Sequence, residues 1–569
     1  MEAADEEQIH HLPPQVDEIS QYSSDGALDI NKQPALKKAT GNWRACFLIL
    51  GAEFSECLAF YGISKNLATY LTTVLHESNV DAARNVSTWG GSCFFTPHIG
   101  AFLADTYWGK YWTGMLTLTV SASLPMLMGS SYNIGIHHVT VYVGLYLIAL
   151  GNGGIKPCTS AFGADQFDGA DSEERVTKSS YFNWYNFAVN TGSVLSGILL
   201  VWVQDNIGWA VGFAIPTVLM VFSLSIFVAG RKVYRYKKLG GSPLTRISQV
   251  VVATLRNYRL VLPDDCSALH ETPEANYKIP HTCQFRMGSP QLQLAEPEHE
   301  RFFDKAAILA PSSGQNEAGP LTSPWRLCTV SQVEELKMLL RMFPIWASMV
   351  LFFTVDAQMS STFIEQGMTM DNRVGPFTVP PASIATFDVI TVIICIPLYD
   401  RVLVPLARRA TGKDRGLSQL QRLGVGLMLS FVAMVYAALV ETKRLEMAKA
   451  GGKLNIMWQA PSFAVLGLGD VFTAIGILEF FYDQSPSCMK SMGTALSQLA
   501  VAAGSYLNSA LIGVVAKTTT RGGAPEWIPD NLNEGHLDYF FWMMASLSLV
   551  NLLYFLLCSM RYRGNNTSL

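Results

Sequence analysis

Residues 209–230 read WAVGFAIPTVLMVFSLSIFVAG, an apolar run of 22 residues that contains no charged side chain. A helix rises about 1.5 Å per residue, so this run can cross the roughly 30 Å apolar layer of a bilayer. The run is followed directly by RKVYRYKK at 231–238, which carries five basic side chains. Because basic clusters beside a span stay on the cytoplasmic side, this stretch predicts a membrane helix and its orientation.

Composition extends this interpretation to the whole chain of 569 residues. Charged residues make up 15% and hydrophobic residues 49%, whereas soluble domains carry about 25% charged residues. A soluble enzyme, a disordered scaffold and a disulfide-rich secreted domain are therefore excluded. The net charge of −4 provides no basic surface for nucleic acid. The lipid bilayer is the first expected partner.

The apolar runs predict an all-α membrane protein with twelve transmembrane helices in two six-helix halves. Each run is long enough to span the bilayer. The predicted ranges are 45–72, 83–106, 112–131, 139–162, 179–204, 209–230, 336–362, 378–404, 417–440, 456–482, 491–516 and 538–559.

A long polar stretch between the sixth and seventh predicted helices divides the chain. Because the number of spans is even and the basic cluster at 231–238 marks the cytoplasm, both termini are expected on the cytoplasmic side. The expected parts are a tail at 1–41, a six-helix bundle at 42–231, a cytoplasmic linker at 232–330, a second six-helix bundle at 331–560 and a tail at 561–569.

Two segments leave alternatives open. Residues 441–453 are expected on the outer side, yet they carry four basic residues, against the charge bias elsewhere. Residues 244–260 place apolar side chains at helical spacing beside a basic face. That linker helix is expected on the membrane surface, against the helix bundle, or as a plain soluble helix.

A weak repeat supports the division into two halves. Residues 100–110 read GAFLADTYWGK and residues 397–401 read PLYDR, so each has an aspartate at a helix end with basic residues after it. Charge pairing there can lock one conformation, which predicts gating roles for Asp105, Lys110, Asp400 and Arg401. The pattern resembles that of the major facilitator superfamily, whose halves rock around a central site.

Carboxylates within the predicted spans are functional candidates, because ionisable groups in a bilayer are costly. Glu53 and Glu56 lie one turn apart in the first helix, on the face that also carries Cys57 and Tyr61. Two partly dehydrated carboxylates at this separation can hold a proton at neutral pH. A polar pair that merely packs between helices is the alternative interpretation.

Ionisable residues also fall in later predicted spans. Lys156 lies in the fourth helix, and Glu479 occupies the matching place in the tenth. If they face each other across a cavity, they form a gate that a substrate charge or a proton would weaken. Asp356 and Asp388 add carboxylates in the seventh and eighth helices. Asp388 can equally be structural.

The sequence contains no arrangement typical of an enzyme. The glycine run at 151–154 lacks the spacing of a phosphate-binding loop, and no paired-histidine helix is present. The cysteines and histidines of the linker fit no common zinc spacing. We expect no enzymatic activity, no cofactor and no metal.

Four stretches resemble the proton-dependent oligopeptide transporter family, specifically its plant nitrate and peptide branch. They are EFSECLAFYG at 53–62, GAFLADTYWGK at 100–110, the set GIKP, FGADQF and FNWYNFAVNTG within 154–192, and LEFFYDQSP at 478–486. The resemblance runs through all twelve predicted helices. The segment YGISKNLATYL at 61–71 most resembles the corresponding segment of the di- and tripeptide transporters of that branch.

This resemblance implies a secondary active transporter that moves small peptides together with protons by alternating access. By position, Glu53 and Glu56 would serve proton coupling, and Asp356 and Glu479 join them as candidates. The protein is expected to function as a monomer in the plasma membrane, with the vacuolar membrane as the alternative.

The resemblance also assigns substrate contacts. Lys156 would meet the carboxylate of the peptide, and Glu479 its amino terminus. Tyr61 and Asn190 would line the cavity. Asp356 favours a peptide over nitrate, because related nitrate transporters carry a histidine there that can become cationic.

The sequence departs from the family pattern in places that leave other functions open. Cys57 stands where the family has Arg or Lys, which removes the cation beside Glu53 and Glu56. Asn186 replaces an aromatic residue, Asp470 replaces Glu, and Ile477 stands where peptide transporters often carry Gln. The alternatives are transport of nitrate, a plant hormone or another metabolite, or a receptor-like protein that binds without coupled transport.

Overall fold

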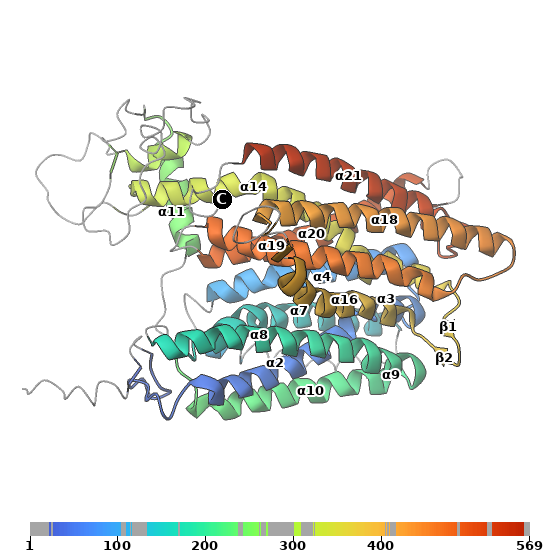
Figure 1. Cartoon of the computed structure of the whole chain (residues 1–569), viewed down its shortest axis with the longest axis horizontal. Helices are drawn as coiled ribbons and strands as arrows, with labels where there is room; N and C mark the ends of the chain where they lie inside the picture. The colour runs from blue at the N-terminus through green and yellow to red at the C-terminus, as the bar shows by residue number, and fades with distance from the viewer. Residues whose placement is uncertain are drawn as a thin grey trace, which may run out of the picture.

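The protein is almost entirely helical in its computed structural model (Figure 1). The described residues are 22–23, 27–103, 110–113, 115, 134–168, 171–236, 243–260, 262, 269–270, 301–308, 323, 325–403, 405–406, 409, 417–485, 490–519 and 526–562. Most of the predicted helix at 112–131 lies outside them.

The first part of the chain folds into long helices joined by short turns. A π-helical turn at Ser196–Leu200 continues one of them without a break. The elements are α2 (Asn42–Ser64), α3 (Leu67–Thr73), α4 (Asn79–Leu103), α7 (Ile134–Ala164), α8 (Ser172–Leu195), α9 (Val201–Asn206) and α10 (Trp209–Ala229).

The linker contributes α11 (Pro243–Arg256), and the second part of the chain is again helical. Its strands form one short antiparallel hairpin, with Arg373 opposite Thr378. The elements are α14 (Val330–Asp356), α15 (Thr362–Met368), β1 (Arg373–Val374), β2 (Phe377–Thr378), α16 (Thr386–Leu398), α18 (Gln419–Lys449), α19 (Ala460–Gln484), α20 (Lys490–Thr519) and α21 (Leu537–Arg561).

The membrane character predicted from sequence is confirmed. Ten helical segments of the described residues are long and apolar enough to cross a bilayer. α4 is 25 residues long and packs among them, but Asp81, Arg84 and other polar residues make it less apolar. With α4 and the range 112–131, the number of membrane-spanning helices would reach twelve. That 112–131 forms a helix stays a prediction.

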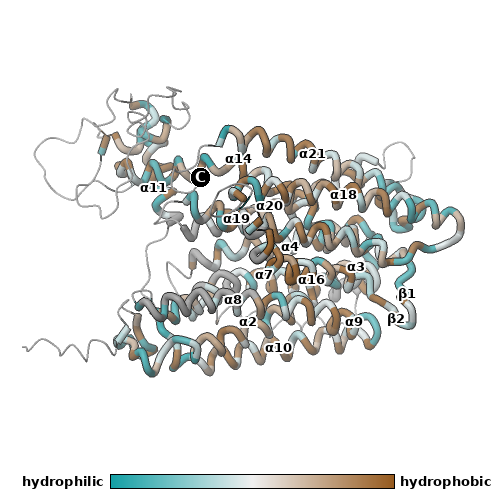
Figure 2. The backbone as a smooth tube through the Cα atoms, in the orientation of Figure 1, coloured by the Kyte–Doolittle hydropathy of each residue, from teal (hydrophilic) through white to brown (hydrophobic). Residues whose placement is uncertain are grey.

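The helices pack side by side in two groups. α2 packs against α8 and α10, while α18 packs against α19 and α21, and α14 against α20 and α21. Figure 1 shows these groups on opposite sides of the molecule. α4 with α20, and α8 with α16, make the contacts that join them. Figure 2 shows apolar residues along the helices and polar residues at the β1–β2 end.

The linker helix α11 lies against the helix bundle, which agrees with one of the alternatives left open by its sequence. Val250 and Ala253 are buried in an apolar cluster with Val333 of α14. Arg246 forms an ion pair of 3.2 Å with Glu335. In Figure 1, α11 lies at the end of the bundle where α2 begins and α21 ends.

Cys328 lies in the same apolar cluster as α11. Burial raises the pKa of its thiol to about 11. The thiol is therefore protonated at neutral pH and packs as a small apolar group. Cys266 and Cys283, the other cysteines considered for a linker metal site, lie outside the described residues.

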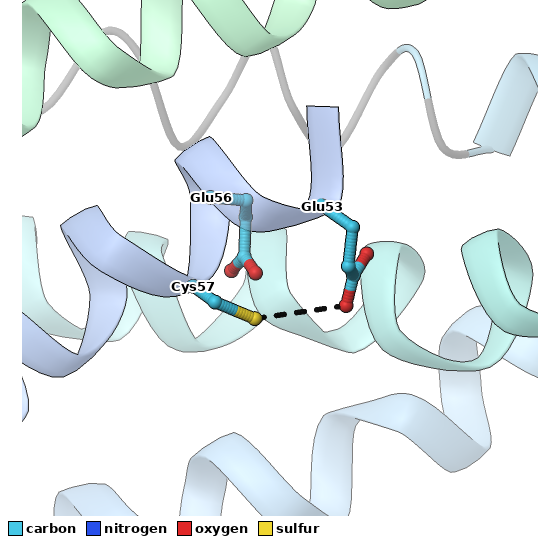
Figure 3. A group of neighbouring side chains, drawn as sticks. All are labelled: Glu53, Glu56 and Cys57. Atoms are coloured by element: carbon cyan, nitrogen blue, oxygen red, sulfur yellow. Dashed lines mark hydrogen bonds between the residues drawn. The ribbon is translucent and has the colours of Figure 1, made fainter. Parts of the chain in front are cut away.

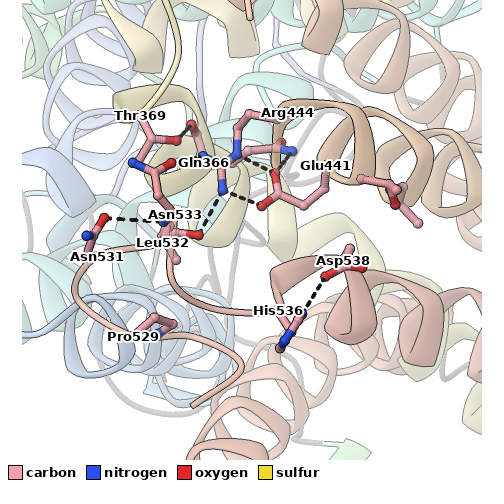
Figure 4. A network of polar contacts seen from close by, with 12 residues as sticks. Gln366, Thr369, Glu441, Arg444, Pro529, Asn531, Leu532, Asn533, His536 and Asp538 are labelled. Carbon is pink, nitrogen blue, oxygen red and sulfur yellow. Dashed lines mark hydrogen bonds and ion pairs between the residues drawn. The ribbon is translucent and has the colours of Figure 1, made fainter. Parts of the chain in front are cut away.

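The basic segment at 441–453 is not a loop at its start, because α18 continues to Lys449. The predicted end of this helix at residue 440 is therefore wrong. Arg444 is buried and pairs with Glu441 one turn earlier, at 2.6 Å. Arg444 also donates to Asn533 and to the carbonyl of Leu532 (Figure 4). This pairing neutralises one of the four charges that conflict with the expected orientation.

We predict that Glu441→Gln strongly destabilises the protein, because Arg444 then keeps a buried charge without its counter-ion. Breaking a buried pair in this way costs about 3–5 kcal/mol. The matched control is Asp81→Asn, which breaks an exposed pair with Arg84 and should cost about 0–1 kcal/mol. Melting in detergent measures both, and equal losses of stability would contradict the prediction.

Candidate functional site

A cavity of about 470 Å³ lies between the two groups of helices, near the middle of the molecule. Its lining comes from α2, α4 and α8 on one side and from α14, α16, α19 and α20 on the other. The lining residues are Tyr61, Lys65, Phe94, Val189, Asn190, Ser193, Phe353, Asp356, Asp388, Val389, Val392, Ile396, Asp470, Val471, Ile477, Leu478, Ser497, Gln498 and Val501.

The charges of this lining are unevenly divided. Asp356, Asp388 and Asp470 come from α14, α16 and α19, on one side of the cavity. Lys65, which follows α2, is the basic residue of the described lining. Three carboxylates beside one ammonium group leave an excess of negative charge away from bulk water. Such a site calls for protons or a cationic ligand group.

The remaining lining is largely apolar on the α16 and α19 side. Val389, Val392 and Ile396 follow one face of α16, and Phe353 of α14 adds to the apolar lining. Tyr61 and Asn190, which the resemblance assigns to the cavity, do lie in its lining. Polar ends and an apolar wall suit a small ligand with charged termini and a variable side chain.

Sequence reasoning missed Lys65 and gave Asp470 no role. Lys65 lines the cavity. Its Nζ donates to the backbone carbonyl of Ser193 in α8 at 2.8 Å. A basic residue just after the first span is a detectable signal, but periodicity could not show which helices it meets.

The carboxylates of the first helix form a separate cluster. Glu53 and Glu56 are buried, and with Cys57 they bring their oxygen and sulfur atoms within 4.8 Å of one another (Figure 3). Tyr185 of α8 donates its hydroxyl to Glu53 Oε1 at 2.7 Å, and the Cys57 thiol donates to the same oxygen at 3.7 Å. This arrangement can share a proton between neighbouring carboxyl groups. None of the three lies in the described lining of the cavity.

The same three residues are also the group whose atoms could hold a metal ion within the described part of the chain. Glu53 Oε1 already accepts two hydrogen bonds, and a thiol must lose its proton before it binds a metal. The donor set therefore fits protons better than a metal.

Glu479 lies next to the cavity but is engaged elsewhere. It pairs with Arg422 of α18 at 2.6 Å, and it is its neighbours Ile477 and Leu478 that line the cavity. Arg422 also stacks over the ring of Tyr399 at 5.4 Å. Lys156 lies in α7, but its side chain is outside the described atoms, so the predicted Lys156–Glu479 pair stays a prediction.

The predicted gating residues are partly described. Lys110 pairs with Asp165, just beyond the end of α7, at 2.6 Å. Asp400 and Arg401 lie in a π-helical turn at Tyr399–Leu403, but the structure does not describe their side chains. Asp105 is also outside it. Their gating roles stay predictions.

A buried polar network joins the two groups of helices where α4 meets α20. Asn508 of α20 donates to Ser87 of α4 at 2.9 Å and accepts from Gln358 at 2.6 Å. All three side chains are buried. Further along the same contact, Thr88 and Ser509 hydrogen-bond at 2.8 Å. These bonds close the bundle between the cavity and the β1–β2 end.

Comparison with known proteins identifies the fold and the family. The POT family profile matches residues 110–528. The chain is 49% identical to Protein NRT1/PTR FAMILY 8.3 of Arabidopsis thaliana, with 97% of each chain covered. An auto-inhibited POT family peptide transporter aligns with a TM-score of 0.70 and 23% identity, over 92% of this chain and 98% of that one.

A POT family transporter solved with a thioalcohol-conjugated peptide aligns with a TM-score of 0.64 and 14% identity, over 96% of this chain and 99% of that one. The protein is thus a multi-pass membrane transporter of the major facilitator fold and not an enzyme. It belongs to the POT family, and within it to the NRT1/PTR family.

We predict that Thr88→Cys with Ser509→Cys forms a disulfide under mild oxidation. The two hydroxyl oxygens are 2.8 Å apart, and disulfides require β-carbons about 3.5–4.5 Å apart. A protease site inserted near residue 290 separates the two parts of the chain, so a disulfide keeps the fragments together on a non-reducing gel. The single variants control for native cysteines, and separation of the oxidised double variant would contradict the closed contact.

Proposed function

We propose that this protein is a proton-coupled symporter of di- and tripeptides that works by alternating access. The observation that carries the proposal is the excess of carboxylates in the cavity, where Asp356, Asp388 and Asp470 accompany one described basic residue. A peptide brings an ammonium group to such a site, and protons supply the rest of the balancing charge. Nitrate lacks the ammonium group and would add a further negative charge.

The volume of the cavity and the known structural relatives of the protein both support a peptide as the substrate. Ligand pockets for small molecules measure about 300–1,000 Å³, and the cavity of about 470 Å³ falls within this range. One structural relative is described as a peptide transporter, and another was solved with a peptide conjugate. The sequence also resembles the di- and tripeptide branch of its family.

Proton coupling rests on two groups of carboxylates. Glu53 and Glu56 share a buried cluster in which Tyr185 and Cys57 act as hydrogen-bond donors. Because Cys57 carries no positive charge, double ionisation of this pair is opposed. Asp356 in the cavity is the third proton site. Glu479 stays a candidate for both proton and substrate, and its pair with Arg422 also suits a gate.

Alternating access requires the two halves, taken as 42–231 and 331–560, to rock around the cavity. The α4–α20 contact would open on one side, while Asp105, Lys110, Asp400 and Arg401 would control the other. The end that carries α11 is assigned to the cytoplasm, because the cluster at 231–238 lies beside it. The membrane is proposed to be the plasma membrane, with the vacuolar membrane as alternative, and the monomer to be the working unit.

A receptor-like function is the second candidate, and Cys57 favours it. Without a cation beside Glu53 and Glu56, the cluster can remain protonated through the whole cycle. Binding of a peptide to the purified protein without uptake into proteoliposomes would support this candidate over the symporter.

We predict that Asp356→Asn raises the KM for a neutral dipeptide by roughly tenfold or more, because a charged contact to the ammonium group is lost. Glu479→Gln should lower the maximal uptake rate but change KM by less than about twofold, since Glu479 bonds to Arg422. Uptake at acidic pH in oocytes measures both constants, with surface expression as the control.

The same pair of variants discriminates between the two roles considered for Glu479. A large rise of KM in Glu479→Gln would restore it as the partner of the peptide amino terminus. An unchanged KM in Asp356→Asn would remove Asp356 from the substrate site.

A further inference from the structure

Lys65 occupies an unusual position for a lysine in a membrane bundle. It follows α2 directly, lines the cavity, and places Nζ 5.8 Å from the centre of the Tyr61 ring. Its Nζ donates a hydrogen bond to the Ser193 carbonyl at 2.8 Å. An ammonium group has three donors, so this bond leaves capacity for an anionic ligand.

The backbone around Lys65 is shaped to admit its ammonium group. α8 changes into the π-helical turn Ser196–Leu200 three residues after Ser193, and such turns are frequent at functional sites. A side chain at Gly197 would lie 3.1 Å from Lys65 Nζ and closer still to Thr386 Oγ1. Glycine at 197 therefore lets Lys65 and the start of α16 approach α8 together.

The charge partner of Lys65 is Asp388, which also lines the cavity and lies two residues after Thr386. Asp388 and Lys65 interact electrostatically, yet no direct ion pair joins them among the contacts of the described residues. Asp388 Oδ1 is buried and has no hydrogen-bond partner there. Opposite charges that share a cavity without touching leave room for a group between them.

We propose that Lys65 is a specificity-determining residue that binds the carboxylate of the substrate. The inference rests on the proposed peptide function and gives the carboxylate a partner besides Lys156. All described carboxylates of the cavity come from α14, α16 and α19, whereas Lys65 follows α2 and bonds to α8. The ligand is therefore oriented with its carboxylate toward α2 and α8.

This assignment also links substrate binding to proton uptake. In the empty cavity, Lys65 balances part of the negative charge of Asp388, Asp356 and Asp470. When a substrate carboxylate pairs with Lys65, the negative charge of these aspartates is no longer balanced by Lys65. The substrate ammonium group supplies one, and a proton supplies the next. With a ligand that lacks a carboxylate, Lys65 would continue to balance Asp388, and less additional positive charge would be required.

A purely structural role for Lys65 makes a different prediction. If Lys65 only holds the Ser193 carbonyl, its loss would weaken the binding of all ligands by the same factor. A carboxylate-binding role instead predicts that the loss depends on whether the ligand carries a carboxylate. Equilibrium binding of L-alanyl-L-alanine and of its C-terminal amide to the purified full-length protein separates the two roles.

The wild type should prefer the free acid over the amide by roughly tenfold or more, as expected for a charged contact. Lys65→Met should reduce this preference several-fold, to the part that Lys156 supplies, and Lys65→Arg should retain most of it. Lys443→Met removes an exposed lysine that stacks on Trp458 and serves as the matched control. Melting in detergent verifies that each variant is folded, and Lys65→Gln replaces Lys65→Met if the latter is not recovered.

The outcomes are distinguishable. If the wild type binds neither ligand, the peptide function itself is contradicted. If the wild type prefers the acid and Lys65→Met weakens acid and amide by the same factor, Lys65 is structural and the inference is overturned. A several-fold loss of the preference in Lys65→Met, with the control unchanged, supports it.

Discussion

The unbalanced charge of the central cavity is the constraint around which this protein is organised. An ionised group inside a membrane bundle must be paired, protonated or bound to a ligand, because bulk water is not available to solvate it. Asp356, Asp388 and Asp470 outnumber Lys65 in the described lining. This shortage of positive charge in the described lining is the basis for proposing that protons and a cationic substrate group bind together in the cavity.

The packing of the helices keeps this cavity between two bodies. The network of Ser87, Gln358 and Asn508 closes one end with buried, mutually satisfied polar groups. At the opposite end, α11 lies against α14 and attaches the linker to the second group of helices. The cavity is thus surrounded by helices whose contacts across the two groups include this polar network as well as apolar residues, such as Ala83 of α4 packed with the second group.

Much of the fold could be predicted from the sequence, because membrane helices are recognisable by the length and hydropathy of their apolar runs. The described helices fall where apolar runs were found. The end of α18 was placed too early, since ETKR at 441–444 resembles a polar loop. Only the three-dimensional neighbours of Arg444 show that a buried ion pair keeps this segment helical.

The site was predictable in part. Helical periodicity placed Glu53, Glu56 and Cys57 on one face, and they do form one cluster. The role of Lys65 could not be found in this way, because its partners Ser193 and Asp388 lie more than a hundred residues away in sequence. Contacts across two halves depend on the packing of the whole bundle and leave no local pattern.

The most direct test is accumulation of a labelled dipeptide in proteoliposomes that contain the purified protein, with an acidic exterior and a neutral interior. A proton-coupled symporter accumulates the dipeptide above its external concentration, and a protonophore abolishes the accumulation. Uptake that stops at equal concentrations and ignores the pH gradient would contradict coupling through the carboxylates of the cavity.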